Sequence, residues 1–128
     1  SLLLLGVTGA IAALADTLFP VESLAEGVAA DFDASSHFLT RLRTIHPVVA
    51  VLSSGYLLHL AGSMISRARR PAIALMVLVL AQLAIGVVNV ILLTPIVVQV
   101  LHLLVADCIW ITLVILAANL SEQPSGPS

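Results

Sequence analysis

His46 and His102 stand inside long apolar runs, where an ionisable side chain is unusual. His46 lies in RTIHPVVA, residues 43–50, and His102 lies in VLHLLVADC, residues 100–108. A neutral imidazole can ligate a metal, relay a proton or hydrogen-bond a neighbouring segment. Ionisable groups in such surroundings are costly and usually functional, so both histidines are candidates for a site.

The composition around these histidines indicates an integral membrane protein. The 128 residues are 60% hydrophobic and only 9% charged, whereas ordinary soluble domains are about 25% charged. The net charge is −2 and aromatic residues make up 4%, so a nucleic-acid partner is not expected. The single cysteine, Cys108, is interpreted as a small core residue. The lipid bilayer is the expected surrounding of most of the chain.

Four apolar segments are long enough to cross a bilayer, which takes about 20 residues. They are residues 1–19, 38–66, 72–94 and 96–119. Short links between them predict an all-α, up-down four-helix transmembrane bundle over residues 1–119. Residues 120–128 are polar and rich in Pro, Gly and Ser, which predicts a disordered tail.

The links also predict how the bundle is oriented. Residues 20–37 are acidic, and Val21, Leu24 and Val28 recur within them at helical spacing, which predicts a short surface helix. The next link, RARR at residues 67–70, is basic, and such short loops stay in the cytoplasm. We therefore expect both termini and the basic link inside, and the acidic link outside.

His46 and His102 are predicted at similar depths on helices that run in the same direction. At 1.5 Å per residue, they lie roughly 13 Å and roughly 10 Å below the outer ends of their helices. Two imidazoles at one level match the ligation of a haem iron from facing helices. The residues alone also allow a proton path, another metal site or interhelical hydrogen bonds.

The third apolar segment carries polar residues on one face. Gln82, Gly86 and Asn89 are spaced i, i+4 and i+7. Asn89 falls near the level of His102 and is expected to fix its ring through the free nitrogen. Gly86 permits close approach of a ring or helix, and Gln82 is expected to pair with Asp107.

Charged and polar residues near the outer end have two interpretations. Arg41 and Arg43 are suited to hold the propionates of a haem, because arginine matches carboxylates well. Alternatively, they extend to lipid headgroups or pair with the acidic link. Asp16 is expected to be satisfied by Thr17 or by an arginine. Pro47 removes the backbone donor for the carbonyl of Arg43, which predicts a kink.

The remaining ionisable residues indicate no separate site. His59 is interpreted as a packing or interfacial residue, His37 as interfacial, and Asp107 as an interhelical hydrogen-bonding partner. A serine, histidine and aspartate set for hydrolysis is not singled out by spacing. A small transporter, with Asp107 as its coupling residue, is a weaker alternative.

Four short motifs resemble the haem A synthase family. In chain order they are ALADTLFP (13–20), RLRTIHPVVA (41–50), QLAIGVVN (82–89) and HLLVADCIW (102–110). They are similar to the second half of those enzymes and cover nearly the whole chain. The resemblance implies a bacterial or archaeal plasma membrane protein of haem A biosynthesis, an oxidoreductase that converts the methyl group of haem O to a formyl group.

The resemblance also implies a division of labour between two four-helix halves. One half holds the substrate haem and a catalytic glutamate three residues before a histidine. The other binds haem b for electron transfer, with His46 and His102 as the implied iron ligands here. Arg41, Arg43 and Asn89 complete the expected cofactor site.

This chain departs from the catalytic half at one position. Arg43 stands three residues before His46, and no glutamate occurs in any predicted membrane segment. The chain therefore resembles the cofactor half alone. It is a fragment of a full enzyme, a half-size member that assembles as a homo-oligomer, or a non-catalytic haem-binding or structural subunit associated with another membrane subunit.

Overall fold

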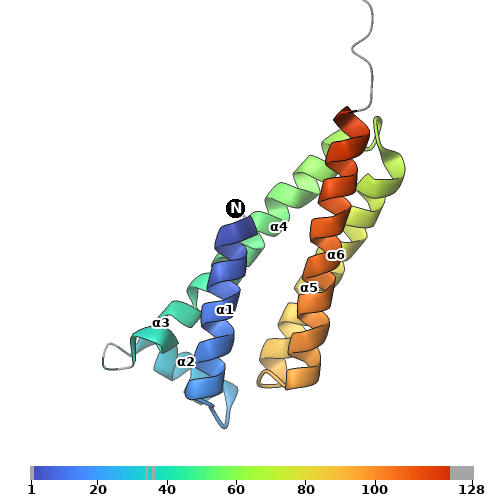
Figure 1. The fold of residues 1–128 in the computed structure, drawn as a ribbon. Coiled ribbons are helices and arrows are strands. Elements are labelled where there is room, and N and C mark those ends of the chain that lie inside the picture. The colour runs from blue at the N-terminus through green and yellow to red at the C-terminus, as the bar shows by residue number, and fades with distance from the viewer. Residues whose placement is uncertain (1, 34, 36, 122–128) are drawn as a thin grey trace, which may run out of the picture.

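The protein is all-helical in the computed structural model, which describes residues 2–33, 35 and 37–121. Its helices follow the chain as α1 (Leu2–Leu18), α2 (Leu24–Phe32), α3 (Phe38–Arg43), α4 (Ile45–Met64), α5 (Arg69–Ile91) and α6 (Ile96–Ser121) (Figure 1). No strand occurs within those ranges. The predicted helical class is confirmed. The predicted tail falls partly in α6, and its remainder, from residue 122, lies outside the described residues.

Three helical segments are long and apolar enough to cross a membrane among the described residues. They are Phe38–Met64, Arg69–Ile91 and Ile96–Ser121. The first predicted segment forms α1, which has 17 residues and is shorter than the other three. These lengths, together with the apolar surface, identify an integral membrane protein.

The closed four-helix bundle is not confirmed. α1 packs mainly on α3 and α4, whereas α5 packs on α4 and α6. Figure 1 shows α1 on one side of α4 and the α5–α6 hairpin on the other, with the two groups diverging toward the end where α2 lies. α4 and α6 run in the same direction, as predicted (Figure 1).

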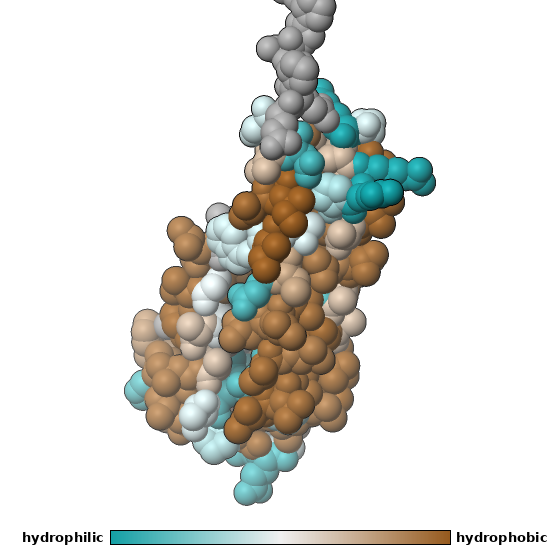
Figure 2. All heavy atoms as spheres, turned by 45° about the vertical axis from the view of Figure 1, so that its right-hand side comes forward, coloured by the Kyte–Doolittle hydropathy of each residue, from teal (hydrophilic) through white to brown (hydrophobic). Residues whose placement is uncertain are grey.

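A small apolar core joins α4, α5 and α6 near the basic link. Its buried residues are Leu57, Ala61, Ala68, Leu75, Val79, Ile109 and Leu116. Alanines at these positions let the helix backbones approach closely. Elsewhere the surface is apolar, and Figure 2 shows a broad hydrophobic face with hydrophilic residues gathered at its two ends. Lipid is the solvent that such a face suits.

The predicted kink near Pro47 is a break between two helices. α3 ends at Arg43, Thr44 is a turn residue and α4 begins at Ile45. Pro47 has no N–H, so the carbonyl of Arg43 lacks its helical donor. The expected single helix over residues 38–66 is therefore divided in two.

The acidic link contains the expected surface helix. Ser23 caps α2 by accepting a hydrogen bond from the N–H of Glu26 at 3.2 Å, and the Glu26 carboxylate accepts from the N–H of Glu22 at 2.9 Å. After the helix, Ser35 donates to Asp33 from its backbone and its hydroxyl. These bonds hold the pKa of Asp33 below its usual value, because they stabilise the charged carboxylate.

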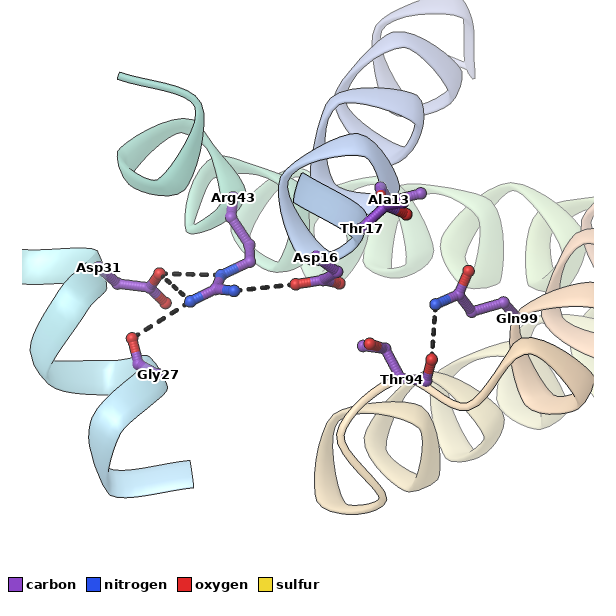
Figure 3. Close-up of polar contacts among 8 residues, drawn as sticks. All are labelled: Ala13, Asp16, Thr17, Gly27, Asp31, Arg43, Thr94 and Gln99. Carbon is purple, nitrogen blue, oxygen red and sulfur yellow. Dashed lines mark hydrogen bonds and ion pairs between the residues drawn. The ribbon is translucent and has the colours of Figure 1, made fainter. Parts of the chain in front are cut away.

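A tight turn connects α5 to α6. Leu93 and Thr94 adopt φ values of 57° and 58°, in the left-handed region that side chains rarely enter. The N–H of Thr94 donates to the carbonyl of Asn89 at 2.8 Å, and Gln99 donates to the carbonyl of Thr94 at 2.7 Å (Figure 3). This turn brings the polar face of α5 back against α6.

Candidate functional site

His46 lies half-buried on α4 and is held from α1. The Thr8 hydroxyl lies 3.3 Å from Nδ1 of His46 and also donates to the carbonyl of Leu5 at 3.1 Å. Because that hydroxyl proton is already used, its oxygen accepts the Nδ1–H of the ring. The neutral imidazole therefore carries its free lone pair on Nε2, the nitrogen with which a histidine commonly ligates a metal.

A glycine lets α1 approach this ring. A Cβ built on Gly9 would lie 3.1 Å from Cε1 of His46, which is closer than ordinary side-chain contacts. Thr8, the neighbour of Gly9, is buried. Thr8 thus supplies a hydrogen-bond acceptor for the His46 ring, and Gly9 supplies the space that the ring needs against α1. Neither was predicted as a site residue from the sequence, although a threonine beside a glycine in an apolar run is a usable signal.

His102 lies half-buried on α6 and is held from α5. The Gln82 amide nitrogen lies 3.1 Å from Nε2 of the ring. An amide NH₂ group can only donate, so Nε2 accepts and the ring proton lies on Nδ1. A Cβ on Gly86 would lie 3.3 Å from Cε1 of His102, so this ring also packs against a glycine.

Three buried polar atoms lack hydrogen-bond partners, one on His102 and two on α5. They are Nδ1 of His102, Oε1 of Gln82 and Oδ1 of Asn89, one donor and two acceptors in the described part of the chain. A buried polar group that lacks a partner costs about 1–3 kcal/mol. Such a cluster is typical of a site that serves a ligand rather than of a packed core.

The expected role of Asn89 is not seen directly, and one predicted pair is wrong. Gln82, not Asn89, hydrogen-bonds the His102 ring. Asp107 is exposed on α6 and does not pair with Gln82. Depth along a helix does not fix the direction in which a side chain points around the helix axis. His102 and Asp107 are five residues apart, which is about 140° around a helix.

The two predicted ligands lie on helices that run in the same direction (Figure 1). His46 is half-buried on α4, and His102 is half-buried on α6. No group of three or more His, Cys, Asp or Glu side chains suited to a metal ion occurs among the residues described. Two histidines are nevertheless sufficient for a haem iron, since the macrocycle supplies its other four nitrogen ligands.

Arg43 makes an ion-pair cluster between α1, α2 and α3 (Figure 3). Its Nη1 lies 2.9 Å from Oδ1 of Asp16, and its Nη2 lies 2.6 Å from Oδ1 of Asp31. Nε also donates to Asp31 at 2.9 Å, and Nη2 donates to the carbonyl of Gly27 at 3.3 Å. Of the two partners expected for Asp16, Thr17 or an arginine, the arginine is the one seen.

The ion-pair cluster shows which of the two expected partners Arg43 contacts, a haem propionate or the acidic residues of the chain. All three charged side chains are largely buried, with 13% of Arg43 and 17% of each aspartate exposed. Of the two interpretations of Arg43, pairing with acidic residues of the chain is the one seen. The side chain of Arg41 lies outside the described part of the structure.

The other two histidines lie on the surface. His59 is exposed on α4. His37 is exposed before α3, stacks on the Phe19 ring at a centroid distance of 4.8 Å, and accepts from the N–H of Leu39 at 3.2 Å. The interpretation of His37 as interfacial and of His59 as a packing or interfacial residue stays a prediction.

Fold and site together define a helical membrane protein with two half-buried histidines on different helices. Residues 2–114 match the COX15-CtaA family, described as cytochrome oxidase assembly protein. The chain belongs to this family, which is the haem A synthase family, and the resemblance drawn from its motifs is confirmed.

Two curated relatives come from Thermus thermophilus and carry another printed name. They are proteins named protoheme IX farnesyltransferase from two strains of that species, 43% and 42% identical to this chain over 130 residues. Each alignment covers 96% of this chain but 21% of the relative, so the chain spans about a fifth of their length. No solved structure gives a significant match.

Proposed function

We propose that this chain is a haem-binding membrane domain of the haem A synthase type, which supplies the haem b and electron-transfer half of methyl-group oxidation in haem O. Family membership supports a role in haem A biosynthesis and cytochrome oxidase assembly. The relatives' name refers to an enzyme acting on protohaem IX, a neighbouring haem-modifying step. The observation that carries the proposal is that His46 on α4 and His102 on α6 are both half-buried, each packed against a glycine of a neighbouring helix.

The residues around that pair fit a haem. Gly9 and Gly86 leave room against each ring, and Thr8 fixes the ring of His46 with Nε2 free. The buried atoms without partners on His102 and α5 give the site polar groups that a packed core would not keep. When bound, haem b would supply one-electron transfer, and His46 and His102 would hold its iron.

The supporting residues take distinct roles. Asn89 offers an acceptor, Oδ1, that suits the Nδ1–H of His102 and would fix that ring. Arg41 remains the candidate for holding a propionate. Arg43 reaches a propionate only by sharing its guanidinium with Asp16 and Asp31, so its main role is to position the helix end that precedes His46.

Catalysis requires a group that this chain does not place near His46. Arg43 occupies the position three residues before the histidine, and the ion-pair cluster holds it there. The acid for methyl oxidation therefore comes from a catalytic half elsewhere, from a second copy or from another membrane subunit. We place the basic link and both termini on the cytoplasmic side, with α2 outside.

One observation favours a second function, that of a non-catalytic haem-binding or structural subunit. The Arg43 cluster ties α1, α2 and α3 into one unit at the position where the family's catalytic half has its acid. A rigid unit of α1, α2 and α3 suits a structural subunit of a larger complex as well as it suits an electron-transfer domain.

Visible spectra of the purified protein test the proposal. Wild type in detergent should show a low-spin b-type spectrum that is lost in His46→Ala and in His102→Ala. His59→Ala, an exposed histidine on α4, is the matched control and should leave the spectrum unchanged. An unchanged spectrum in either ligand variant would refute the ligand pair. A folded wild type without haem would instead support the structural subunit.

A further inference from the structure

We propose that Gln82 is a positioning residue that competes with the haem iron for Nε2 of His102, which makes this axial bond the exchangeable one of the pair. The proposal rests on the proposed function and concerns how the two ligands differ. His46 is then the permanent ligand, and haem enters and leaves the site by way of the His102 side.

The competition follows from the lone pair on one nitrogen. A neutral imidazole has a single nitrogen that accepts, and in His102 this is Nε2, because Gln82 donates to it at 3.1 Å. The same lone pair cannot accept that hydrogen bond and coordinate iron at once. Iron therefore binds His102 through Nε2 only after the Gln82 amide has moved away.

The partner of His46 does not compete in this way. Thr8 lies against Nδ1, and its oxygen accepts the ring proton, so Nε2 is left for a metal. A hydrogen bond at this position orients the ring and raises the basicity of the ligand. One hydrogen bond thus supports ligation at His46, whereas the other opposes it at His102.

The surroundings of His102 provide for the exchange. When Nε2 leaves Gln82, the ring's Nδ1–H can turn to an acceptor of α5, since Oε1 of Gln82 and Oδ1 of Asn89 are both buried without partners. Both residues lie on one face of α5, on either side of Gly86. A Cβ at Gly86 would press on Cε1 of the ring, so glycine leaves the ring free to turn.

The hydrogen bond itself can be tested without haem. In the full chain, labelled with ¹⁵N-histidine and held in lipid nanodiscs, His102 should carry its proton on Nδ1. Gln82→Leu removes the donor and should shift His102 toward a mixture of tautomers. A His102 signal that Gln82→Leu leaves unchanged would overturn the proposal at its first step.

Haem release then tests the competition. Transfer of haem from the loaded protein to excess apomyoglobin should be about fivefold slower in Gln82→Leu, the factor expected from losing one hydrogen bond that competes with the iron. Gln82→Glu should release haem faster, because its carboxylate accepts from Nε2–H and keeps the ligating nitrogen protonated. Opposite effects of the two variants cannot arise from general misfolding.

Gln99→Leu is the matched control, since Gln99 donates to the carbonyl of Thr94 and not to His102. Its rate of haem release should equal that of wild type. Equal or faster release from Gln82→Leu, with wild type binding haem normally, would refute the competition alone. A wild type that binds no haem would refute the proposed function instead, while the tautomer measurement would still report on the Gln82 contact.

Discussion

His46 and His102 are the same side chain at comparable burial, yet their neighbours prepare them differently. His46 is fixed through Nδ1 by Thr8, close to the ion-pair cluster of Arg43. His102 is fixed through Nε2 by Gln82, among buried polar atoms that lack partners. The residue type of a ligand therefore does not define a binding site by itself. A neighbour that hydrogen-bonds the other nitrogen leaves the ligating nitrogen free for iron. A neighbour that hydrogen-bonds the ligating nitrogen must first be displaced.

Breaking the ion-pair cluster of Arg43 should produce the largest difference in stability between the surroundings of His46 and those of His102. Arg43→Met leaves Asp16 and Asp31 largely buried without a counter-ion, which should cost about 2 kcal/mol of stability. Because α1 then loosens from α3, the haem bond to His46 should weaken before that to His102. Thermal unfolding in detergent, followed by circular dichroism and by the haem spectrum, measures both effects.

Arg69→Met, an exposed arginine at the start of α5, is the control for charge removal. Adding Asp16→Asn and Asp31→Asn to Arg43→Met should recover part of the lost stability, because the unpaired charges are then removed. If Arg43→Met unfolds at the same temperature as Arg69→Met, the cluster does not secure the His46 side.

Crowding each ring from its glycine should give an intermediate effect. Gly9→Ala places a methyl group 3.1 Å from the His46 ring, and Gly86→Ala places one 3.3 Å from the His102 ring. Overpacking costs about 1–3 kcal/mol, so haem affinity should fall about tenfold in Gly9→Ala and less in Gly86→Ala. Haem titrations measure both affinities.

Gly6→Ala is the matched control on α1, because a Cβ at Gly6 meets nothing within 4 Å. It should bind haem like wild type. A larger loss in Gly86→Ala than in Gly9→Ala would show that the His102 ring, and not the His46 ring, is the more tightly confined of the two.

The smallest effect should come from the hydrogen bond to His46. Thr8→Val keeps the shape but removes the acceptor for Nδ1–H, which should lower haem affinity by up to about tenfold. The haem reduction potential should become more positive, since a less basic imidazole stabilises the oxidised iron less. Spectroelectrochemical titration measures the potential.

Thr17→Val serves as its control, because Thr17 lies on the same helix and donates only to the carbonyl of Ala13 at 2.8 Å. The control should leave the potential unchanged. Equal potentials in wild type and Thr8→Val would mean that Thr8 does not tune His46, and the contrast between the two histidines would then rest on Gln82 alone.

Much of this protein follows from sequence patterns that act within a single segment. Long apolar runs predict the three helices long enough to span a membrane, and Pro47 predicts the interruption before α4. Of the partners expected for Asp16, Thr17 or an arginine, the structure shows the arginine, which supplies a counter-ion to the carboxylate. The four-helix bundle is not confirmed, and apolar runs by themselves do not specify which helices pack together.

The sequence by itself determined the helical membrane fold, the family and the two histidines as candidate ligands, because hydrophobic length and residue type depend on composition and local order. Only the tertiary structure decided that Thr8 holds one nitrogen of His46 and that Gln82 holds the other nitrogen of His102. Those contacts depend on the rotation of each helix about its axis. Rotation is set by packing between helices, and no single helix encodes it.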